Sequence, residues 1–127
     1  MGDTLRISGI IDESIVDGKG LRYTIFTQGC PHHCEGCHNP DTHDFGGGTE
    51  KEITVIYEEI CKNPLLSGVT FSGGEPFCQS APLAALAEMV HKKGLNVTTY
   101  TGYTFEQLLE MKNSDIQHLL TQTDILI

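Results

Sequence analysis

Residues 29–40 of this chain read Gly29-Cys30-Pro31-His32-His33-Cys34-Glu35-Gly36-Cys37-His38-Asn39-Pro40. Three cysteines fall within eight residues of this segment, with the spacing C-x3-C-x2-C. Thiolates that close together in one loop can bind a single inorganic centre, and iron–sulfur clusters are held by such thiolates. A cubane 4Fe–4S cluster normally has four cysteine ligands, so three would leave one iron open to a substrate, as a catalytic zinc keeps one open position. We therefore predict that Cys30, Cys34 and Cys37 hold a cluster with one open iron.

Two other uses of these cysteines remain open at this point. A structural zinc site of the Cys3His kind would combine the three cysteines with either His38 or His32. A disulfide would leave an odd thiol, and nothing else in the sequence is typical of a secreted protein. The choice between cluster and zinc depends on the rest of the chain.

The composition indicates one intracellular domain that does not bind nucleic acid. The 127 residues suffice for a single domain, 1–127, with a modest core. We expect a cytoplasmic protein without membrane contact, because the sequence has no bilayer-length apolar run and no basic-then-apolar leader. Five cysteines in a reducing compartment favour metal or redox use. A formal charge of −9 repels phosphate backbones, which argues against a nucleic-acid partner.

Hydrophobic patterning predicts strands that alternate with helices. β-Branched and aromatic residues indicate strands at residues 5–11, 21–28, 68–72, 96–100 and 124–127. Apolar residues at helical spacing indicate helices at residues 52–62, 80–93 and 105–111 and a short helical turn at 116–120, and residues 41–49 form a polar loop. Ser80 is a good N-cap for the second helix, and Thr104 with Gln107 matches a capping box for the third.

This order of elements predicts a parallel sheet whose functional loops share one rim. Right-handed crossovers make successive strands parallel, so their carboxyl ends meet at one edge. Three loops leave those ends, namely the cysteine loop, Gly73-Gly74-Glu75-Pro76 and Thr101-Gly102-Tyr103. Two glycines let the backbone approach a ligand closely and Glu75 adds a carboxylate, although a simple glycine turn explains the second loop equally well. The convergence of the three loops favours a catalytic cluster over a structural zinc.

The two remaining cysteines are predicted not to be ligands. Cys61 lies on the apolar face of the helix at residues 52–62 and is best explained as a small core residue. Cys78 follows the Gly-Gly-Glu-Pro loop, but a fourth ligand would close the open iron. We therefore expect Cys78 to lie near the site without binding the cluster.

The combination of C-x3-C-x2-C at residues 30–37 with Ser72-Gly73-Gly74-Glu75-Pro76 resembles the radical S-adenosylmethionine superfamily. A closer resemblance is to the activating proteins of anaerobic ribonucleoside-triphosphate reductase. It is carried by Asp17-Gly18-x-Gly20-Leu21-Arg22, by Cys37-His38-Asn39-Pro40 and by Tyr100-Thr101-Gly102-Tyr103. The resemblance covers essentially the whole chain, and its first two motifs are specific at the level of the superfamily.

The resemblance implies a fold, two cofactors and a set of binding residues. The fold is an α/β fold, an incomplete (β/α) barrel with a parallel sheet. Cys30, Cys34 and Cys37 would hold a 4Fe–4S cluster, and S-adenosylmethionine would bind its open iron through its amino and carboxylate groups. The cofactor site would be lined by Gly36, Cys37 and His38 and by Gly73, Gly74 and Glu75, of which the last three would receive the amino group. No side chain is expected to act as a catalytic residue, because the cluster and the sulfonium carry the chemistry.

The resemblance also implies an activity and its partners. An external one-electron donor, such as a flavodoxin or ferredoxin, would reduce the cluster, and S-adenosylmethionine would be cleaved to a 5′-deoxyadenosyl radical. That radical would remove a hydrogen atom from a backbone glycine of a large partner enzyme, here anaerobic ribonucleotide reductase. The alternatives are activation of another glycyl-radical enzyme of the pyruvate formate-lyase type, modification of a small molecule, or a non-catalytic zinc-stabilised binding module.

Two positions depart from the family pattern. Lys19 stands where related proteins often have proline, which changes little. The sequence ends at Ile127, whereas family members usually continue for another strand or more, so we expect a chain truncated at its C-terminus with an exposed edge strand.

Overall fold

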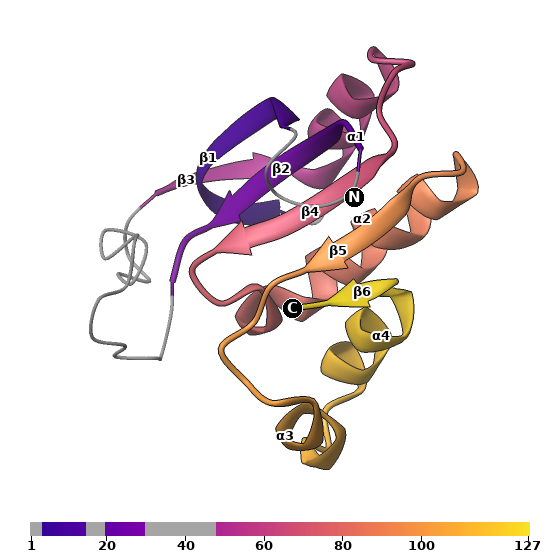
Figure 1. The fold of residues 1–127 in the computed structure, drawn as a ribbon. Helices are drawn as coiled ribbons and strands as arrows, with labels where there is room; N and C mark the ends of the chain where they lie inside the picture. The colour runs from indigo at the N-terminus through magenta and orange to yellow at the C-terminus, as the bar shows by residue number, and fades with distance from the viewer. Residues whose placement is uncertain (1–3, 15–19, 30–47) are drawn as a thin grey trace.

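The computed structural model describes residues 4–14, 20–29 and 48–127 and shows a mixed sheet with helices packed against it (Figure 1). Within these ranges the sheet has six strands, in the order β3-β1-β2-β4-β5-β6. The strands are β1 (Thr4–Ser14), β2 (Arg22–Thr27), β3 (Thr49–Glu52), β4 (Gly68–Gly73), β5 (Asn96–Thr99) and β6 (Ile125–Leu126). The helices are α1 (Ile53–Cys61), the 3₁₀ helix η2 (Pro76–Gln79), α2 (Ser80–Lys92), α3 (Phe105–Glu110) and α4 (Ser114–Gln122).

The strands come in two directions, which corrects the expectation of a purely parallel sheet. β2, β4, β5 and β6 are parallel to one another, whereas β1 is antiparallel to β2 and β3 is antiparallel to β1. Only seven residues separate the end of β1 from the start of β2, and a parallel crossover needs a dozen or more. The mixed sheet is compatible with part of a barrel, and closure into a barrel stays a prediction.

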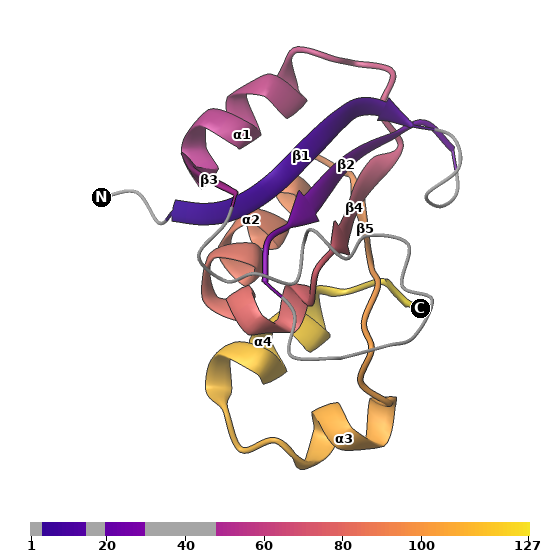
Figure 2. The same cartoon turned by 90° about the vertical axis from the view of Figure 1, so that its left-hand side faces the viewer.

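The hydrophobic core lies between the sheet and the helices on one of its sides, where α1, α2 and α4 are seen in Figure 2. Apolar side chains of β2, β4 and β5 meet apolar side chains of α1 and α2. The fully or almost fully buried members of these elements include Tyr23, Ile25, Val69, Phe71 and Val97 on the sheet and Ile56, Ile60, Leu83, Leu86 and Val90 on the helices. Burial of such side chains is the main force that holds helices on the sheet.

The other face of the same strands is polar. Arg22, Thr24, Thr70 and Thr98 are fully buried, and the last three lie side by side in register on β2, β4 and β5. Arg22 Nε donates a hydrogen bond of 2.6 Å to Thr70 Oγ1, and Arg22 Nη2 donates one of 2.8 Å to the Val69 carbonyl oxygen. Burial lowers the pKa of the Arg22 guanidinium, opposed by the charge of Asp124. Arg22 thus joins the amino ends of β2 and β4, at the edge opposite the predicted rim.

Capping side chains mark where α3 and α4 begin, whereas α2 begins without one. The predicted capping box is confirmed, because Thr104 Oγ1 accepts from the Gln107 amide at 3.1 Å and Gln107 Oε1 accepts from the Thr104 amide at 2.8 Å. The predicted N-cap at Ser80 is wrong. Gln79 takes that place, since η2 leads straight into α2 and the Ser80 hydroxyl donates back to the Phe77 carbonyl at 2.6 Å. Asn113 caps α4 through its side-chain oxygen, which the sequence reading missed.

A histidine joins α2 to the end of the sheet. His91 Nε2 lies 2.8 Å from Asp124 Oδ2, and His91 Nδ1 lies 2.7 Å from Gln122 Oε1, so both ring nitrogens face oxygen acceptors. Burial alone would lower the pKa of His91, but the hydrogen bonds to Asp124 and Gln122 and the charge of Asp124 together raise it above its ordinary value. The same Asp124 oxygen accepts from the Val97 amide at 2.7 Å.

The stability contributed by His91 should therefore depend on pH. A raised pKa in the folded chain means that the contribution is complete below the unfolded value of 6.5 and is lost as the pH rises through the folded value. We expect His91→Leu to reduce the free energy of unfolding more at pH 6 than at pH 8.5, as measured by urea denaturation. The other five histidines are present in both the unchanged chain and His91→Leu, so their contributions to the pH dependence cancel in the comparison. A difference between the variants that is independent of pH would refute this role.

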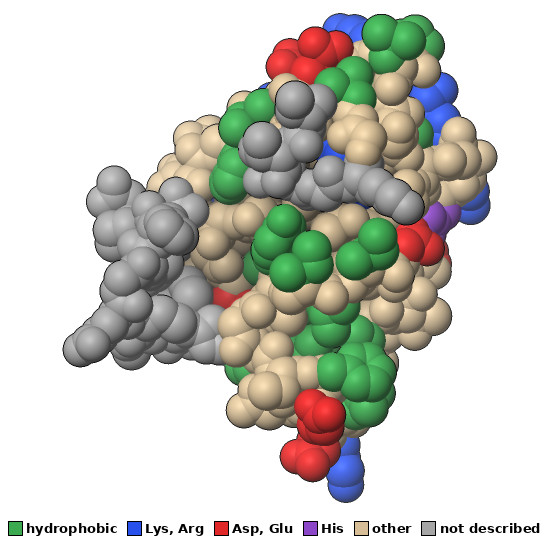
Figure 3. All heavy atoms as spheres, viewed as in Figure 1, with side chains coloured by type: hydrophobic (Ala, Val, Ile, Leu, Met, Phe, Trp, Pro, Cys, Tyr) green, Lys and Arg blue, Asp and Glu red, His purple; other side chains and the backbone are tan. Residues whose placement is uncertain are grey.

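Hydrophobic side chains reach the surface around β6 and α3 (Figure 3). Phe105 and Leu109 on α3 are 52% and 53% exposed, and Ile125 and Ile127 beside the sheet edge are 43% and 54% exposed. Among the described strands, β6 pairs with β5 and is the last in the order, whereas truncation at the C-terminus stays a prediction. None of the helices within the described ranges has the length and hydropathy that a bilayer span requires.

Candidate cofactor site

The carboxyl ends of β2 and β4 are joined backbone to backbone. Thr27 and Gly73, the last residues of the two strands, are partners in the parallel register. Beyond them, the Gly74 amide donates to the Thr27 carbonyl at 2.7 Å and the Glu75 amide donates to the Gly29 carbonyl at 2.8 Å. The Gly-Gly-Glu segment therefore lies directly against Gly29, the residue that precedes Cys30.

Gly73 and Gly74 are required by this close approach. Gly73 has a φ of 90°, and a Cβ placed there would lie 2.5 Å from the Thr27 amide nitrogen. A Cβ on Gly74 would overlap the Gly29 carbonyl oxygen and lie 2.8 Å from its carbon. The glycines serve first to pack the loop on the strand that leads into the cysteine loop. Both remain partly exposed, so their backbone is also accessible to a ligand.

Glu75 turns its carboxylate away from solvent and toward the next strand end. Its side chain is fully buried. Oε1 accepts from the Gly102 amide at 2.8 Å, and Oε2 accepts from the Phe77 amide at 3.1 Å. The Thr101 hydroxyl lies 3.0 Å from Oε1 and 2.8 Å from Oε2. In each of these contacts an N–H or O–H group donates to a carboxylate oxygen, so the Glu75 side chain bonds to the loop after β5 and to the start of η2.

These bonds confirm that the second and third predicted loops share one rim. Glu75 follows β4, and Thr101 with Gly102 follows β5, which is parallel to β4. The Tyr100 amide adds a backbone bond of 2.9 Å to the Phe71 carbonyl. The loop-to-loop contact through Glu75 was missed by the sequence reading, although adjacent parallel strands ending in a carboxylate and in Thr-Gly could have indicated it.

The predicted cysteine ligands lie outside the described residues. This holds for Cys30, Cys34 and Cys37, for Gly36 and His38 in the same loop, for His32 as a zinc ligand, and for most of the polar loop at residues 41–49. Of the remaining two cysteines, Cys61 is partly buried on α1 and Cys78 is exposed on η2. The Cys78 amide donates to the Glu75 carbonyl at 3.0 Å, so Cys78 is a neighbour of the Gly-Gly-Glu segment.

The described part of the rim fits the two cofactors that the sequence implies. The strand that leads to the cysteines ends in contact with a partly exposed backbone that carries no side chains at Gly73 and Gly74. The amino group of S-adenosylmethionine could approach that backbone closely, beside a cluster bound by the neighbouring loop. The buried Glu75 holds the segment in position through its bonds to Thr101 and Gly102.

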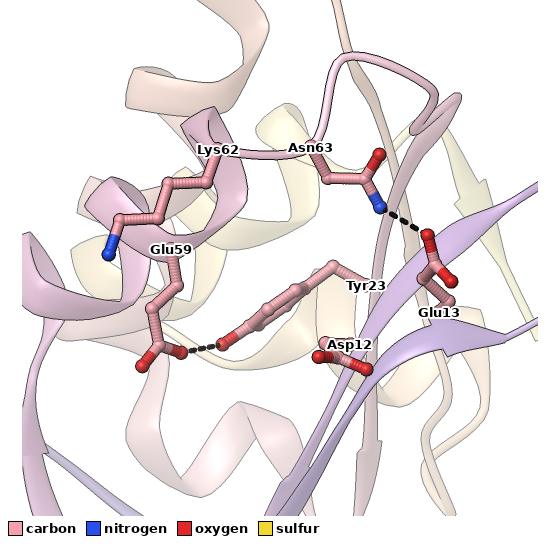
Figure 4. Close-up of a pocket in the computed structure, with 6 residues that line it drawn as sticks. All are labelled: Asp12, Glu13, Tyr23, Glu59, Lys62 and Asn63. Atoms are coloured by element: carbon pink, nitrogen blue, oxygen red, sulfur yellow. Dashed lines mark hydrogen bonds between the residues drawn. The ribbon is translucent and has the colours of Figure 1, made fainter.

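A hollow away from the rim lies near the opposite end of β2 (Figure 4). Its volume is about 370 Å³, and it is lined by Asp12, Glu13, Tyr23, Glu59, Lys62 and Asn63. Tyr23 is the second residue of β2, far along the strand from Thr27 and the rim. No residue predicted for the cofactor site lines this hollow, so it is separate from that site.

The contacts in this hollow are those of a structural network. The Tyr23 hydroxyl donates to Glu59 Oε2 at 2.6 Å, and Lys51 Nζ lies 3.2 Å from Glu59 Oε1. Burial and the adjacent Glu59 carboxylate raise the pKa of Tyr23. The hydrogen bond from Tyr23 lowers the pKa of Glu59, and desolvation of Glu59 opposes this effect. The neutral phenol and the ionised carboxylate thus stabilise each other and join β2 to α1.

Comparison with known proteins identifies the family to which this chain belongs. The sequence profile of a family described as a 4Fe-4S single cluster domain matches residues 16–127. The chain belongs to this family of 4Fe–4S single cluster domains. It is 37% identical over 122 residues to the pyruvate formate-lyase-activating enzyme of Clostridium pasteurianum, covering 87% of this chain and 50% of that enzyme. It is 36% identical over 98 residues to the enzyme of the same name from Listeria monocytogenes, covering 73% of this chain and 40% of that enzyme.

These matches bear on the predictions in different ways. They support membership of the radical S-adenosylmethionine superfamily and confirm the expectation of a 4Fe–4S cluster and S-adenosylmethionine as cofactors. They do not support the finer resemblance to activating proteins of anaerobic ribonucleotide reductase. The family profile favours the cluster over the zinc alternative. The chain spans about half the length of the curated relatives it matches, or less.

Proposed function

We propose that this chain is the cluster-bearing part of an activating enzyme that introduces a glycyl radical into a large enzyme of the pyruvate formate-lyase type. The observation that carries the proposal is the joined rim of β2, β4 and β5, where the Gly-Gly-Glu segment is bonded to the residue before the cysteine loop. The similarity to pyruvate formate-lyase-activating enzymes supports this partner over anaerobic ribonucleotide reductase.

The roles of the residues follow from the rim. We assign Cys30, Cys34 and Cys37 as the three cluster ligands, and the lining of the S-adenosylmethionine site to Gly36, Cys37, His38, Gly73, Gly74 and Glu75. Gly73 and Gly74 offer the accessible backbone of this lining, whereas the buried Glu75 carboxylate holds the segment in place. When bound, the cluster and S-adenosylmethionine supply the one-electron cleavage and the adenosyl radical that takes a hydrogen atom from the target glycine.

Three broader assignments complete the proposal. Residues 1–127 form one domain, which is supported by the presence of both β1 and β6 in the same sheet. The electron comes from an external one-electron donor such as a flavodoxin or ferredoxin. The protein works in the cytoplasm, where thiolate ligands stay reduced.

A second candidate partner is anaerobic ribonucleotide reductase. It is favoured by the sequence motifs Cys37-His38-Asn39-Pro40 and Tyr100-Thr101-Gly102-Tyr103, whose Thr101 and Gly102 are in contact with Glu75. Both candidates share the cofactors and the reaction, and they differ only in the protein that carries the target glycine.

Electron paramagnetic resonance distinguishes the partners. The chain, reconstituted anaerobically with iron and sulfide, would be mixed with a reductant, S-adenosylmethionine and one of the two candidate enzymes. We expect a glycyl signal with the pyruvate formate-lyase-type enzyme and at most a weak one with the reductase. A stronger signal with the reductase would favour the second candidate. Absence of a signal with both enzymes, from a chain shown to contain its cluster, would contradict the proposed function.

A further inference from the structure

We infer that Thr101 is a positioning residue for S-adenosylmethionine binding, acting through Glu75 on the Gly73–Gly74 backbone. The inference rests on the proposed function and extends it to the loop after β5, a part of the rim to which no cofactor role has been assigned above. Thr101 acts at one remove from the cofactor, because its effect is transmitted by the hydrogen bonds between the two loops.

The Thr101 hydroxyl sits at the centre of a chain of bonds. It has one proton, which it directs between the two oxygens of Glu75 at 2.8 and 3.0 Å. As an acceptor it receives the Tyr103 amide at 3.1 Å. The hydroxyl therefore closes the turn at residues 101–103 and, at the same time, ties that turn to the carboxylate. A hydroxyl that both donates and accepts is strengthened by each of its bonds.

Glu75 carries this restraint to the predicted cofactor site. Its carboxylate accepts from the loop after β5, its amide donates to Gly29, and Gly74 just before it donates to Thr27. The side chain thus joins the third strand end to the two others. A shift of the carboxylate would move the Gly73–Gly74 backbone relative to the strand that leads to the cysteines, and a small displacement of a binding group can cost much of its affinity.

The two chemical parts of the Thr101 side chain can be separated by substitution. Valine has nearly the same shape but lacks the hydroxyl, so Thr101→Val removes the bonds to Glu75 and Tyr103. Serine keeps the hydroxyl and removes the methyl group, so Thr101→Ser preserves both bonds. Thr121 on α4 provides a matched control, because its exposed hydroxyl bonds only within its own helix among the contacts described, at 2.8 Å to the Gln117 carbonyl.

Equilibrium dialysis with S-adenosylmethionine tests the inference on the cluster-loaded chain. We expect Thr101→Val to raise the dissociation constant by about tenfold or more, since a hydrogen bond to a buried charged group is lost. The dissociation constant of Thr101→Ser should lie within about threefold of that of the unchanged chain, and Thr121→Val should have the same dissociation constant as the unchanged chain. The double variant Thr101→Val with Glu75→Gln should bind no more weakly than Glu75→Gln alone, because the two residues act in series.

A second measurement does not depend on the cofactor. Amide hydrogen exchange should be faster at Gly102 and Tyr103 in Thr101→Val than in Thr101→Ser or Thr121→Val. Binding by Thr101→Val equal to that of the unchanged chain would overturn the inference and leave the proposed function intact. A serine variant as weak as the valine variant would also overturn it. Failure of the unchanged, cluster-loaded chain to bind S-adenosylmethionine would instead overturn the proposed function, and the inference with it.

Discussion

Replacing Glu75 by alanine is expected to lower the free energy of unfolding by about 3 kcal/mol, as measured by urea denaturation. The carboxylate is fully buried and accepts hydrogen bonds from Thr101, Gly102 and Phe77. Removing it leaves the buried Phe77 amide and the Thr101 hydroxyl without their acceptor and opens a cavity between two strand ends. Such a loss is large for one side chain, because hydrogen bonds to a charged group contribute more than neutral ones.

Two further variants show whether the cause is the one stated. Glu75→Gln keeps the size of the side chain but turns an NH2 group toward at least one of the N–H donors, so we expect it to be destabilising as well. Glu110→Ala removes an exposed carboxylate from the end of α3 and should change stability by less than about 0.5 kcal/mol. A glutamine variant as stable as the unchanged chain would show that the carboxylate is not needed where the structure places it.

Cys30→Ala, Cys34→Ala and Cys37→Ala are each expected to abolish cluster binding. A 4Fe–4S cluster with three protein ligands has none to spare, so the loss of one thiolate leaves two irons without a protein ligand. Iron and sulfide assays after anaerobic reconstitution should give about four of each per unchanged chain and less than about a tenth of that in these variants. The visible absorbance of the cluster should fall in the same proportion.

The other cysteines serve as matched controls for this prediction. Cys61→Ala on α1 and Cys78→Ala on η2 should retain a full complement of iron and sulfide. Cys78 is the stricter control, because its backbone is bonded to Glu75 beside the Gly-Gly-Glu segment. Loss of the cluster in Cys78→Ala would assign a fourth ligand and close the open iron. One tightly bound zinc in place of iron would favour the zinc-stabilised module instead.

Features set by neighbouring residues could be predicted from the sequence. The capping box of Thr104 and Gln107 needs only four residues, and it forms as expected. Gly73 and Gly74, at the end of β4, are predicted to allow close backbone approach, which they do, although the approaching group is the backbone of Thr27 and Gly29. The shared rim of β4 and β5 followed from strand order alone, because parallel strands end at the same edge.

Features that depend on distant residues were missed. β3 is Thr49-Glu50-Lys51-Glu52, with no apolar alternation, and it forms because β1 offers it a partner at the sheet edge. β1 is antiparallel to β2 because the connection between them is too short for a parallel crossover. The pattern of apolar residues in a strand carries no information on its direction. The buried position of Glu75 could not be read from its type, since a glutamate is seldom fully buried unless its bonds are satisfied. Two of its donors, Thr101 and Gly102, lie 26 and 27 residues away and cannot be found from a local pattern.

The central claim is that an incompletely ligated cluster binds S-adenosylmethionine at the joined ends of β2, β4 and β5. Its most direct test is the electron paramagnetic resonance spectrum of the reduced, reconstituted chain, recorded before and after addition of S-adenosylmethionine. Binding at the open iron predicts a clear change in the signal of the cluster, and this change should require a higher concentration of S-adenosylmethionine in Thr101→Val. A spectrum of a 4Fe–4S cluster that is unaltered by saturating S-adenosylmethionine would contradict the claim.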